Sequence, residues 1–303
     1  MTMSGIIQPT ATHQIANGKV EILCFGKNTG SWKPNLHLVG TDNLHMCNET
    51  DNWSCCLVSK LRNYLDGIKK IWVPSPRLFT GRIDERQNWP TAIPCFGTTS
   101  PLIAFGQTTE GIKLEPSEAI LIGTADCTVI TIHNRITGFT ASAHGGLNSL
   151  VDRARIRTGV ASRPNDSVVD HLIEIMGSER KNLEILISCS IGPKYFLHEQ
   201  EKNEHINEKE AKDNELLIKY IGSNWGNVCL GPDPLGQINL ANLIIEQFDR
   251  HGVDRSAISH DGADTYSDVD KSGNHLWWSH RRFTDNGKSG IDGRNGTLIK
   301  RLR

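Results

Sequence analysis

The sequence predicts an α/β protein, because strand-like apolar runs alternate along its 303 residues with segments of helical periodicity. A hairpin signal spans residues 119–148, where two β-rich runs flank the turn-like stretch 134–138. A continuous apolar run at residues 183–190 is typical of a buried strand. Apolar residues at helical spacing predict amphipathic helices over residues 168–176 and 240–248.

The chain before the hairpin contains fewer recognisable elements. Residues 20–26 predict an opening strand, residues 51–65 a helix with one apolar stripe, and residues 68–73 a further strand. Residues 74–116 are rich in proline, threonine and glycine. We interpret them as loop with short strands, or as a divergent insertion.

Helices are expected again after the hairpin. Residues 147–160 favour a helix that carries three arginines, which we interpret as a solvated face or as an anion site. Asp166 or Ser167 stands where the N-cap of the first amphipathic helix belongs, and Gly177 ends that helix. Residues 199–219 are highly charged and predict an exposed helix.

The alternation of residues in the hairpin favours one pairing of its strands. With residues 134–137 as a four-residue loop, Cys127 falls opposite His144, one face is apolar and the other polar. Directly opposed residues have Cβ atoms about 4.5–5.5 Å apart, close enough for proton exchange or shared metal binding. An imidazolium beside a thiol stabilises the nucleophilic thiolate, and Gly145 and Gly146 let the backbone approach a ligand. The competing interpretation is a buried thiol beside a histidine of the core or surface.

The last forty residues combine aromatic side chains, clustered arginines and a glycine-rich loop. Trp277 and Trp278 precede Arg281 and Arg282, and Arg294 follows the loop. This composition suits the binding of a flat or anionic small molecule, with a basic surface tail as the alternative.

Bulk properties restrict the expected partners and location. The formal net charge of −1 gives no field that would attract nucleic acid or an anionic membrane, and no apolar run approaches the length of a membrane span. The start lacks the pattern of a secretion signal, and the eight cysteines include no C-x-x-C pair. We therefore expect a cytoplasmic protein that acts on a small molecule, without nucleic acid or membrane as partner. The sequence leaves the oligomeric state open.

Four short motifs follow one another in an order typical of one family. They are TADC at residues 124–127, AHGG at 143–146, IGP at 191–193, and SHRR followed by GRNGTLI within 279–299. With these motifs the chain resembles the YfiH-type laccase-domain family, long labelled multicopper polyphenol oxidases, most firmly from about residue 111 to residue 303. The resemblance implies a single α/β domain with a mixed sheet, CNF/YfiH-like, over residues 1–303, and a pocket beside the hairpin.

The resemblance also implies zinc-dependent chemistry on purine nucleosides, namely phosphorolysis and adenosine deamination. The family's metal site uses two histidines and one cysteine, and Cys127 and His144 match the cysteine and one histidine. The other histidine belongs to a Q-x-H motif, whereas residues 72–77 contain no histidine. The sequence thus supplies an incomplete zinc site whose third ligand is not found, because His133 lies too far along its strand. The W-R-G that follows the family's histidine is replaced by residues 147–149, so an arginine suited to an anionic substrate is missing.

Three functions remain open at this point. The first is the family's purine nucleoside chemistry. The second is a metal-independent cysteine hydrolase or amidase, deamidase-like, with Cys127 as nucleophile, His144 as base and backbone N–H groups near Gly145 or Gly192 as oxyanion donors. The third is a non-catalytic relative that binds a small molecule. For all three, the candidate substrate-binding residues are Asp126, Gly145, Gly146, Asn148, Gly192, Arg281, Arg282 and Arg294.

Overall fold

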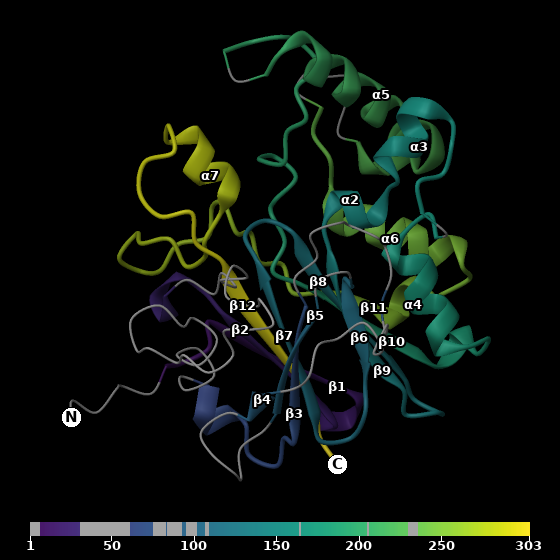
Figure 1. Ribbon diagram of the computed structural model, residues 1–303, viewed down its shortest axis with the longest axis vertical. Helices are drawn as coiled ribbons and strands as arrows, with labels where there is room; N and C mark the ends of the chain where they lie inside the picture. The colour runs from purple at the N-terminus through teal and green to yellow at the C-terminus, as the bar shows by residue number, and fades with distance from the viewer. Residues whose placement is uncertain are drawn as a thin grey trace.

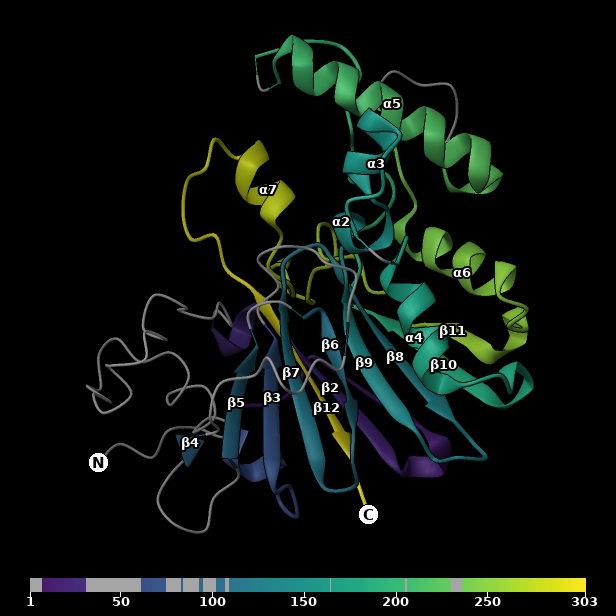
Figure 2. The ribbon, with the colours of Figure 1, turned by 45° about the vertical axis from the view of Figure 1, so that its right-hand side comes forward.

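The structure is a computed structural model that describes residues 7–30, 61–74, 83, 93–94, 102–106, 109–163, 165–204, 206–229 and 236–303. Within these ranges, a sheet of seven strands and a sheet of five strands stack face to face, with helices gathered beside the smaller sheet (Figures 1 and 2). Both sheets contain parallel and antiparallel pairs. The predicted α/β class with mixed sheets is confirmed.

The seven-stranded sheet has the order β1-β2-β12-β7-β3-β5-β4. Its strands are β1 (Ala11–Ile15), β2 (Val20–Phe25), β3 (Lys70–Pro74), β4 (Ile93–Pro94), β5 (Leu102–Gly106), β7 (Glu118–Thr124) and β12 (Asn295–Arg301). β2 and β3 agree with the predicted strands. β12 was not predicted, although it is buried between β2 and β7 and pairs antiparallel with both. Its apolar signal is short and is followed by Lys300, which pairs across the strands with Glu21.

The five-stranded sheet has the order β11-β10-β8-β9-β6. Its strands are β6 (Gly111–Leu114), β8 (Thr128–Asn134), β9 (Thr140–Gly145), β10 (Leu183–Ser188) and β11 (Ile258–His260). The predicted first arm of the hairpin is in fact two strands, because the chain passes from β7 in the larger sheet to β8 in the smaller one. Cys127 lies in this crossover, directly before β8.

The predicted register of the hairpin is wrong by two residues. β8 and β9 pair with Val129 opposite His144 and His133 opposite Thr140. The segment that follows His133 before its partner residue is two residues longer than expected, because Gly138, at φ +69°, lies within the turn and donates its N–H to the carbonyl of Asn134 at 2.8 Å. Since the shift is an even number of residues, each side chain keeps its predicted face. The polar face is buried against the larger sheet and is not turned to solvent.

The helices lie beside the smaller sheet, apart from α7 (Figures 1 and 2). They are α2 (Leu147–Leu150), α3 (Arg153–Thr158), α4 (Val168–Met176), α5 (Glu208–Asn224), α6 (Leu240–Arg250) and α7 (His280–Asp285). Short 3-10 turns occur at Ala16–Gly18, Lys27–Thr29, Arg62–Tyr64, Arg180–Asn182, Gly226–Val228 and Arg255–Ala257. The described helices include none long and apolar enough to cross a bilayer.

Local capping explains where the predicted helices begin and end. α4 starts with a capping box of Ser167 and Asp170 and ends at Gly177, as its sequence predicts. The single helix expected over residues 147–160 is two helices, because the extended Val151 precedes Asp152, which caps α3. α5 begins at Glu208, later than the start of the predicted 199–219 segment.

Three apolar layers hold these elements together. One lies between the helices and the smaller sheet and contains Ile130, Ile132 and the apolar stripes of α4 and α6. A second lies between the two sheets and contains Val129, and a third covers the far face of the larger sheet. The β8–β9 hairpin therefore has one face on each of two cores. Most of the predicted helix over residues 51–65, and most of residues 74–116, lie outside the described residues.

Candidate functional site

Three reactive side chains meet where β6, β8 and β9 lie side by side. Glu110 directly precedes β6 and lies opposite His144, whose N–H donates to the Glu110 carbonyl at 2.9 Å. Cys127 directly precedes β8, and the register places it opposite Gly146. Because directly opposed residues and their diagonal neighbours share a face, the carboxylate, imidazole and thiol lie on one side of this sheet.

The imidazole of His144 is held from two sides. Its Nδ1 lies 2.9 Å from Oε2 of Glu110, and a side-chain hydrogen bond joins the ring to Cys127. Gly146 provides the room for this contact, since a Cβ there would lie 2.6 Å from Cε1 of His144 and 3.1 Å from Sγ of Cys127. Gly146 has φ −78°, which any residue can adopt, so glycine is required here for space.

The charges around His144 favour its protonated form. Burial lowers the pKa of His144, but the neighbouring Cys127 and Glu110 raise it by more, and the net result is a pKa of about 10. Glu110 is fully buried, and its Oε1 has no hydrogen-bond partner among the described residues. Cys127 is half-buried, whereas Glu110 and His144 are buried, so Cys127 is the most exposed residue of the three.

The described residues do not complete the zinc site that the resemblance implies. Within the described ranges, one group of three residues brings histidine, cysteine and carboxylate ligand atoms close enough to share an ion. That group is His13, Cys24 and Asp261, and it includes neither Cys127 nor His144. Cys127 and His144 could supply two ligands, and Nδ1 of His144 is already bound to Glu110. His133 bonds to Thr140.

Asp126 links the site to the C-terminal segment. Its Oδ1 accepts from the Thr265 hydroxyl at 2.9 Å, and its Oδ2 accepts from the backbone N–H of Arg281 at 2.7 Å. Burial raises the pKa of Asp126. The side chain of Arg281 pairs with Glu199 and Asp285. Asp126 thus positions the start of α7 next to Cys127.

The remaining predicted residues have structural partners of their own. The guanidinium of Arg282 donates to the carbonyls of Thr265, Tyr266 and Trp277. Arg294 pairs with Asp292 at 2.6 Å. The N–H of Gly192 donates to Oδ1 of Asp264 at 2.8 Å, so this N–H is already engaged and is not free to stabilise an oxyanion. A Cβ at Gly192 would lie 2.4 Å from the Asp264 carboxylate.

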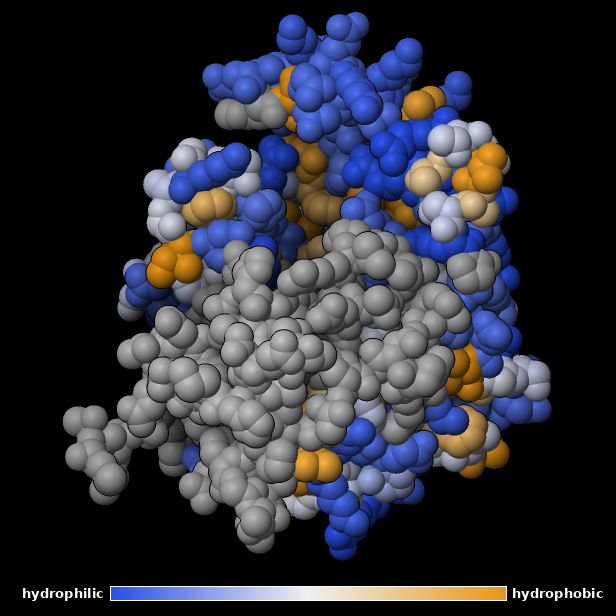
Figure 3. All heavy atoms as spheres, viewed as in Figure 1, coloured by the Kyte–Doolittle hydropathy of each residue, from blue (hydrophilic) through white to orange (hydrophobic). Residues whose placement is uncertain are grey.

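Asn148 lines a polar cleft of about 490 Å³ between α3 and α5. Neither Cys127 nor His144 is among the described residues of its lining. Arg163 also lines this cleft and donates to the carbonyls of Asn148 and Ser149 at 2.6 and 3.2 Å. Residues 147–149 replace the family's W-R-G, so an arginine from another part of the chain contacts the segment from which the family's arginine is missing. Figure 3 shows a hollow on this face of the molecule, between α7 and the α2–α3 segments, with apolar surface at its floor.

His198 is a half-buried histidine that the sequence did not single out. Burial lowers its pKa to about 3, with further lowering by the positive charges of Arg153 on α3 and Arg281 on α7. Its Nδ1 has no hydrogen-bond partner within the described part of the chain. Two guanidinium groups therefore lie near one neutral imidazole.

Glu110, which contacts His144, is the main residue of the candidate site that the sequence analysis did not identify. It stands one residue before the part of the chain in which family motifs occur, and a lone carboxylate before a short strand has no distinctive spacing. Only the pairing of β6 with β9 brings it to His144.

Fold and site together define a two-sheet α/β protein with a thiol, an imidazole and a carboxylate at the end of the smaller sheet. Residues 111–301 match the family described as multi-copper polyphenol oxidoreductase laccase, and the chain belongs to this family. The predicted YfiH-type laccase-domain membership is confirmed. Among curated proteins, none matches the sequence significantly.

Solved structures share this fold at low sequence identity. The hypothetical protein YfiH of Bacillus licheniformis is 18% identical with a TM-score of 0.55, covering 94% of this chain and 93% of its own. The Neisseria meningitidis protein NMB0706 is 15% identical with a TM-score of 0.60, covering 97% and 99%. YlmD of Geobacillus stearothermophilus is 16% identical with a TM-score of 0.56, covering 94% and 92%.

Proposed function

We propose that this protein is a thiol-dependent hydrolase that releases ammonia from an amide or amidine carbon of a small molecule. The observation that carries the proposal is the continuous contact from Glu110 through His144 to Cys127. A nucleophile beside a base that a third group orients is the arrangement that covalent catalysis requires. The half-buried thiol is the group that meets the substrate.

The reaction needs no group beyond these residues and water. The Cys127 thiolate adds to the carbon that bears the amino group, and the His144 imidazolium gives its proton to the departing nitrogen, which leaves as ammonia. His144 then takes a proton from water, whose oxygen attacks the same carbon and expels the thiolate. The balance is one water consumed, one ammonia released and a carbonyl formed. Glu110 holds the ring in the required orientation and stabilises its positive charge.

The substrate class we favour is an aminopurine nucleoside. The amino-bearing carbon of adenine is amidine-like, and adenosine deamination is part of what the family resemblance implies. A thiolate attack would allow that outcome with the two family ligands that this chain retains. A cytoplasmic location belongs to the same proposal, because the described cysteines are free thiols.

Phosphorolysis of a purine nucleoside is the second candidate. The positive charges of Arg153 and Arg281 both lower the pKa of His198, and positive charge in this region suits an anionic co-substrate such as inorganic phosphate. Arg281 is also balanced by Glu199 and Asp285, so phosphate would compete with two carboxylates there. The family resemblance implies zinc for this chemistry, and the described residues supply two of its three ligands.

A nucleoside panel separates these candidates. The purified chain is incubated with adenosine, guanosine and inosine, with and without phosphate and chelator, and ammonia, free base and sugar phosphate are measured. Ammonia release that survives chelation and is lost in Cys127→Ala and His144→Ala supports the hydrolase, and Cys229→Ala serves as the matched control. Base release that requires phosphate supports the second candidate. Nucleoside binding without turnover, or turnover unchanged by both substitutions, would refute the proposal.

A further inference from the structure

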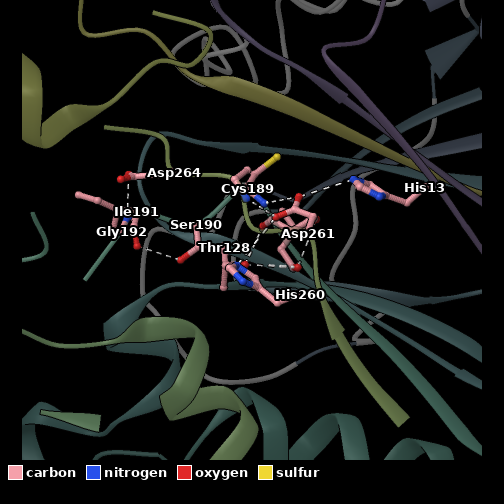
Figure 4. Close-up of polar contacts among 12 residues, drawn as sticks. His13, Thr128, Cys189, Ser190, Ile191, Gly192, His260, Asp261 and Asp264 are labelled. Carbon is pink, nitrogen blue, oxygen red and sulfur yellow. Dashed lines mark hydrogen bonds and ion pairs between the residues drawn. The ribbon is translucent and has the colours of Figure 1, made fainter. Parts of the chain in front are cut away.

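A second group of ligating side chains lies away from Cys127 and His144. His13 on β1, Cys24 on β2 and Asp261 just after β11 bring one nitrogen, one sulfur and one oxygen within 4.8 Å of one another. Cys189, just after β10, adds a second sulfur in hydrogen-bond contact with Cys24. Figure 4 shows Asp261 between His13 and Cys189.

The topology brings these four residues to one seam between the sheets. β1 is an edge strand of the larger sheet and also contacts β10 of the smaller sheet. The β1–β2 register sets His13 opposite Ile22, so Cys24 is its diagonal neighbour on the same face. Asp261 and Cys189 follow the ends of the paired strands β11 and β10.

Two features of this group lower the stability of the fold when no ligand is bound. Nε2 of His13 is buried and has no hydrogen-bond partner in the described chain, its nearest carboxylate oxygen being Oδ2 of Asp261 at 3.6 Å. Cys189 has φ +57°, in the left-handed region that non-glycine residues rarely adopt. Its N–H donates to Oδ2 of Asp261 at 3.0 Å, which fixes the sulfur and the carboxylate relative to each other.

Asp261 is held as a ligand would be. Its side chain is 1% exposed, and its Oδ1 accepts from the backbone N–H of Ala263 at 3.0 Å. His260 lies 3.9 Å from the same oxygen. Each carboxylate oxygen thus accepts from one backbone N–H and keeps a lone pair free for a ligand, and Oδ2 lies 3.6 Å from Nε2 of His13. Such orientation of ligands by outer hydrogen bonds is typical of metal sites.

We propose that His13, Cys24, Cys189 and Asp261 bind a zinc ion that joins the edges of the two sheets. Imidazole nitrogen, thiolate and carboxylate oxygen are the ligands zinc prefers, and four protein ligands define a closed, structural site. Ligand atoms around a tetrahedral zinc ion stand about 3.3–3.8 Å apart, so the ligand atoms of His13, Cys24 and Asp261, which lie within 4.8 Å of one another, close by at most about 1.5 Å. Cys189 lies outside that three-membered group and completes the site by a turn of its side chain toward Cys24. Binding releases the two thiol protons.

This site is independent of the proposed hydrolase, and the experiment keeps the two apart. Full-length protein is stripped of metal under reducing conditions, loaded with zinc, desalted and analysed for metal content. The same is done with the Cys127→Ala/His144→Ala double variant, and zinc affinity is measured by competition with a chromophoric chelator. Cobalt replaces zinc in a parallel sample, because thiolate-bound cobalt has a charge-transfer absorption that reports the sulfur ligands.

We expect the double variant to retain one zinc per chain. His13→Gln in that background should weaken zinc binding at least about tenfold, as loss of even an outer partner does. Cys24→Ser should also weaken the cobalt–thiolate band, because Cys189 then supplies the single remaining thiolate ligand. His13 is on an edge strand with its side chain 26% exposed, so this substitution leaves the fold intact where a core variant would not. Cys229→Ser controls for the loss of a thiol.

Three results would overturn the proposal. The first is the absence of retained zinc in the double variant. The second is zinc binding that His13→Gln and Cys24→Ser leave unchanged. The third is a thiol count showing that Cys24 and Cys189 form a disulfide under the reducing conditions used, which would make the group a covalent cross-link.

Discussion

Replacing Glu110 by glutamine tests the electrostatics of the proposed site directly. The substitution keeps the size of a fully buried side chain and removes its charge 2.9 Å from Nδ1 of His144. The glutamine side chain would still offer an oxygen to the ring, so the orientation of the imidazole is retained. What is lost is the charge that favours the imidazolium.

The expected size of the effect follows from the strength of that contact. A hydrogen bond to a charged group contributes about 1.5–3 kcal/mol, and one pKa unit corresponds to about 1.4 kcal/mol. The pKa of His144, about 10 in the parent protein, should therefore fall by about one to two units. A weaker positive charge on His144 also gives less support to a nucleophilic sulfur beside it, so alkylation of Cys127 should slow.

The pKa is measured by NMR titration of nitrogen-15 labelled histidine, and alkylation by the rate of reaction with iodoacetamide. Glu184→Gln is the matched control, because Glu184 pairs with Arg135 and faces His133. A His144 pKa that stays within about half a unit of the parent value in Glu110→Gln would refute the charge coupling on which the mechanism depends.

Three further outcomes are expected. Gly146→Ala places a Cβ 2.6 Å from Cε1 of His144. This substitution should slow alkylation of the Cys127 thiol at least about tenfold, because small misplacements in a site have effects of that size. Gly222→Ala is the control and should leave the rate unchanged, because no atom lies within 4 Å of the added Cβ. Asp126→Ala leaves two buried donors without an acceptor and should lower the free energy of unfolding by about 1–3 kcal/mol per donor in urea titrations, with Asp126→Asn less severe; equal losses would contradict this account. Folding raises the pKa of His144 from 6.5 to about 10, so the stabilisation that its protonated form contributes is complete below pH 6.5 and is lost as pH rises to 10. The free energies of unfolding of the parent protein and of His144→Gln, measured by denaturation across this range, should therefore converge at high pH.

The even shift in hairpin register shows why Cys127 and His144 share a face although their predicted direct pairing is wrong. Strand alternation assigns each residue to a face, and a shift of two residues preserves that assignment. Cys127 and His144 therefore lie on one face, as the sequence indicates, but as diagonal neighbours over Gly146 and not as a direct pair. The decisive factor was one glycine at positive φ in the turn, which the pattern of apolar residues does not encode.

By itself the sequence determined the local features of this protein: the strands with clear alternation, the caps of α4, the family motifs and the thiol–imidazole pair. These features depend on residues close in the chain, where side-chain period and capping chemistry leave a readable pattern. Only the tertiary structure decided that β12 enters the middle of the larger sheet, that Glu110 supports His144, and that His13, Cys24 and Asp261 meet at a seam. Hydrogen bonds between strands far apart in sequence select those neighbours, and backbone pairing of that kind carries no local signature.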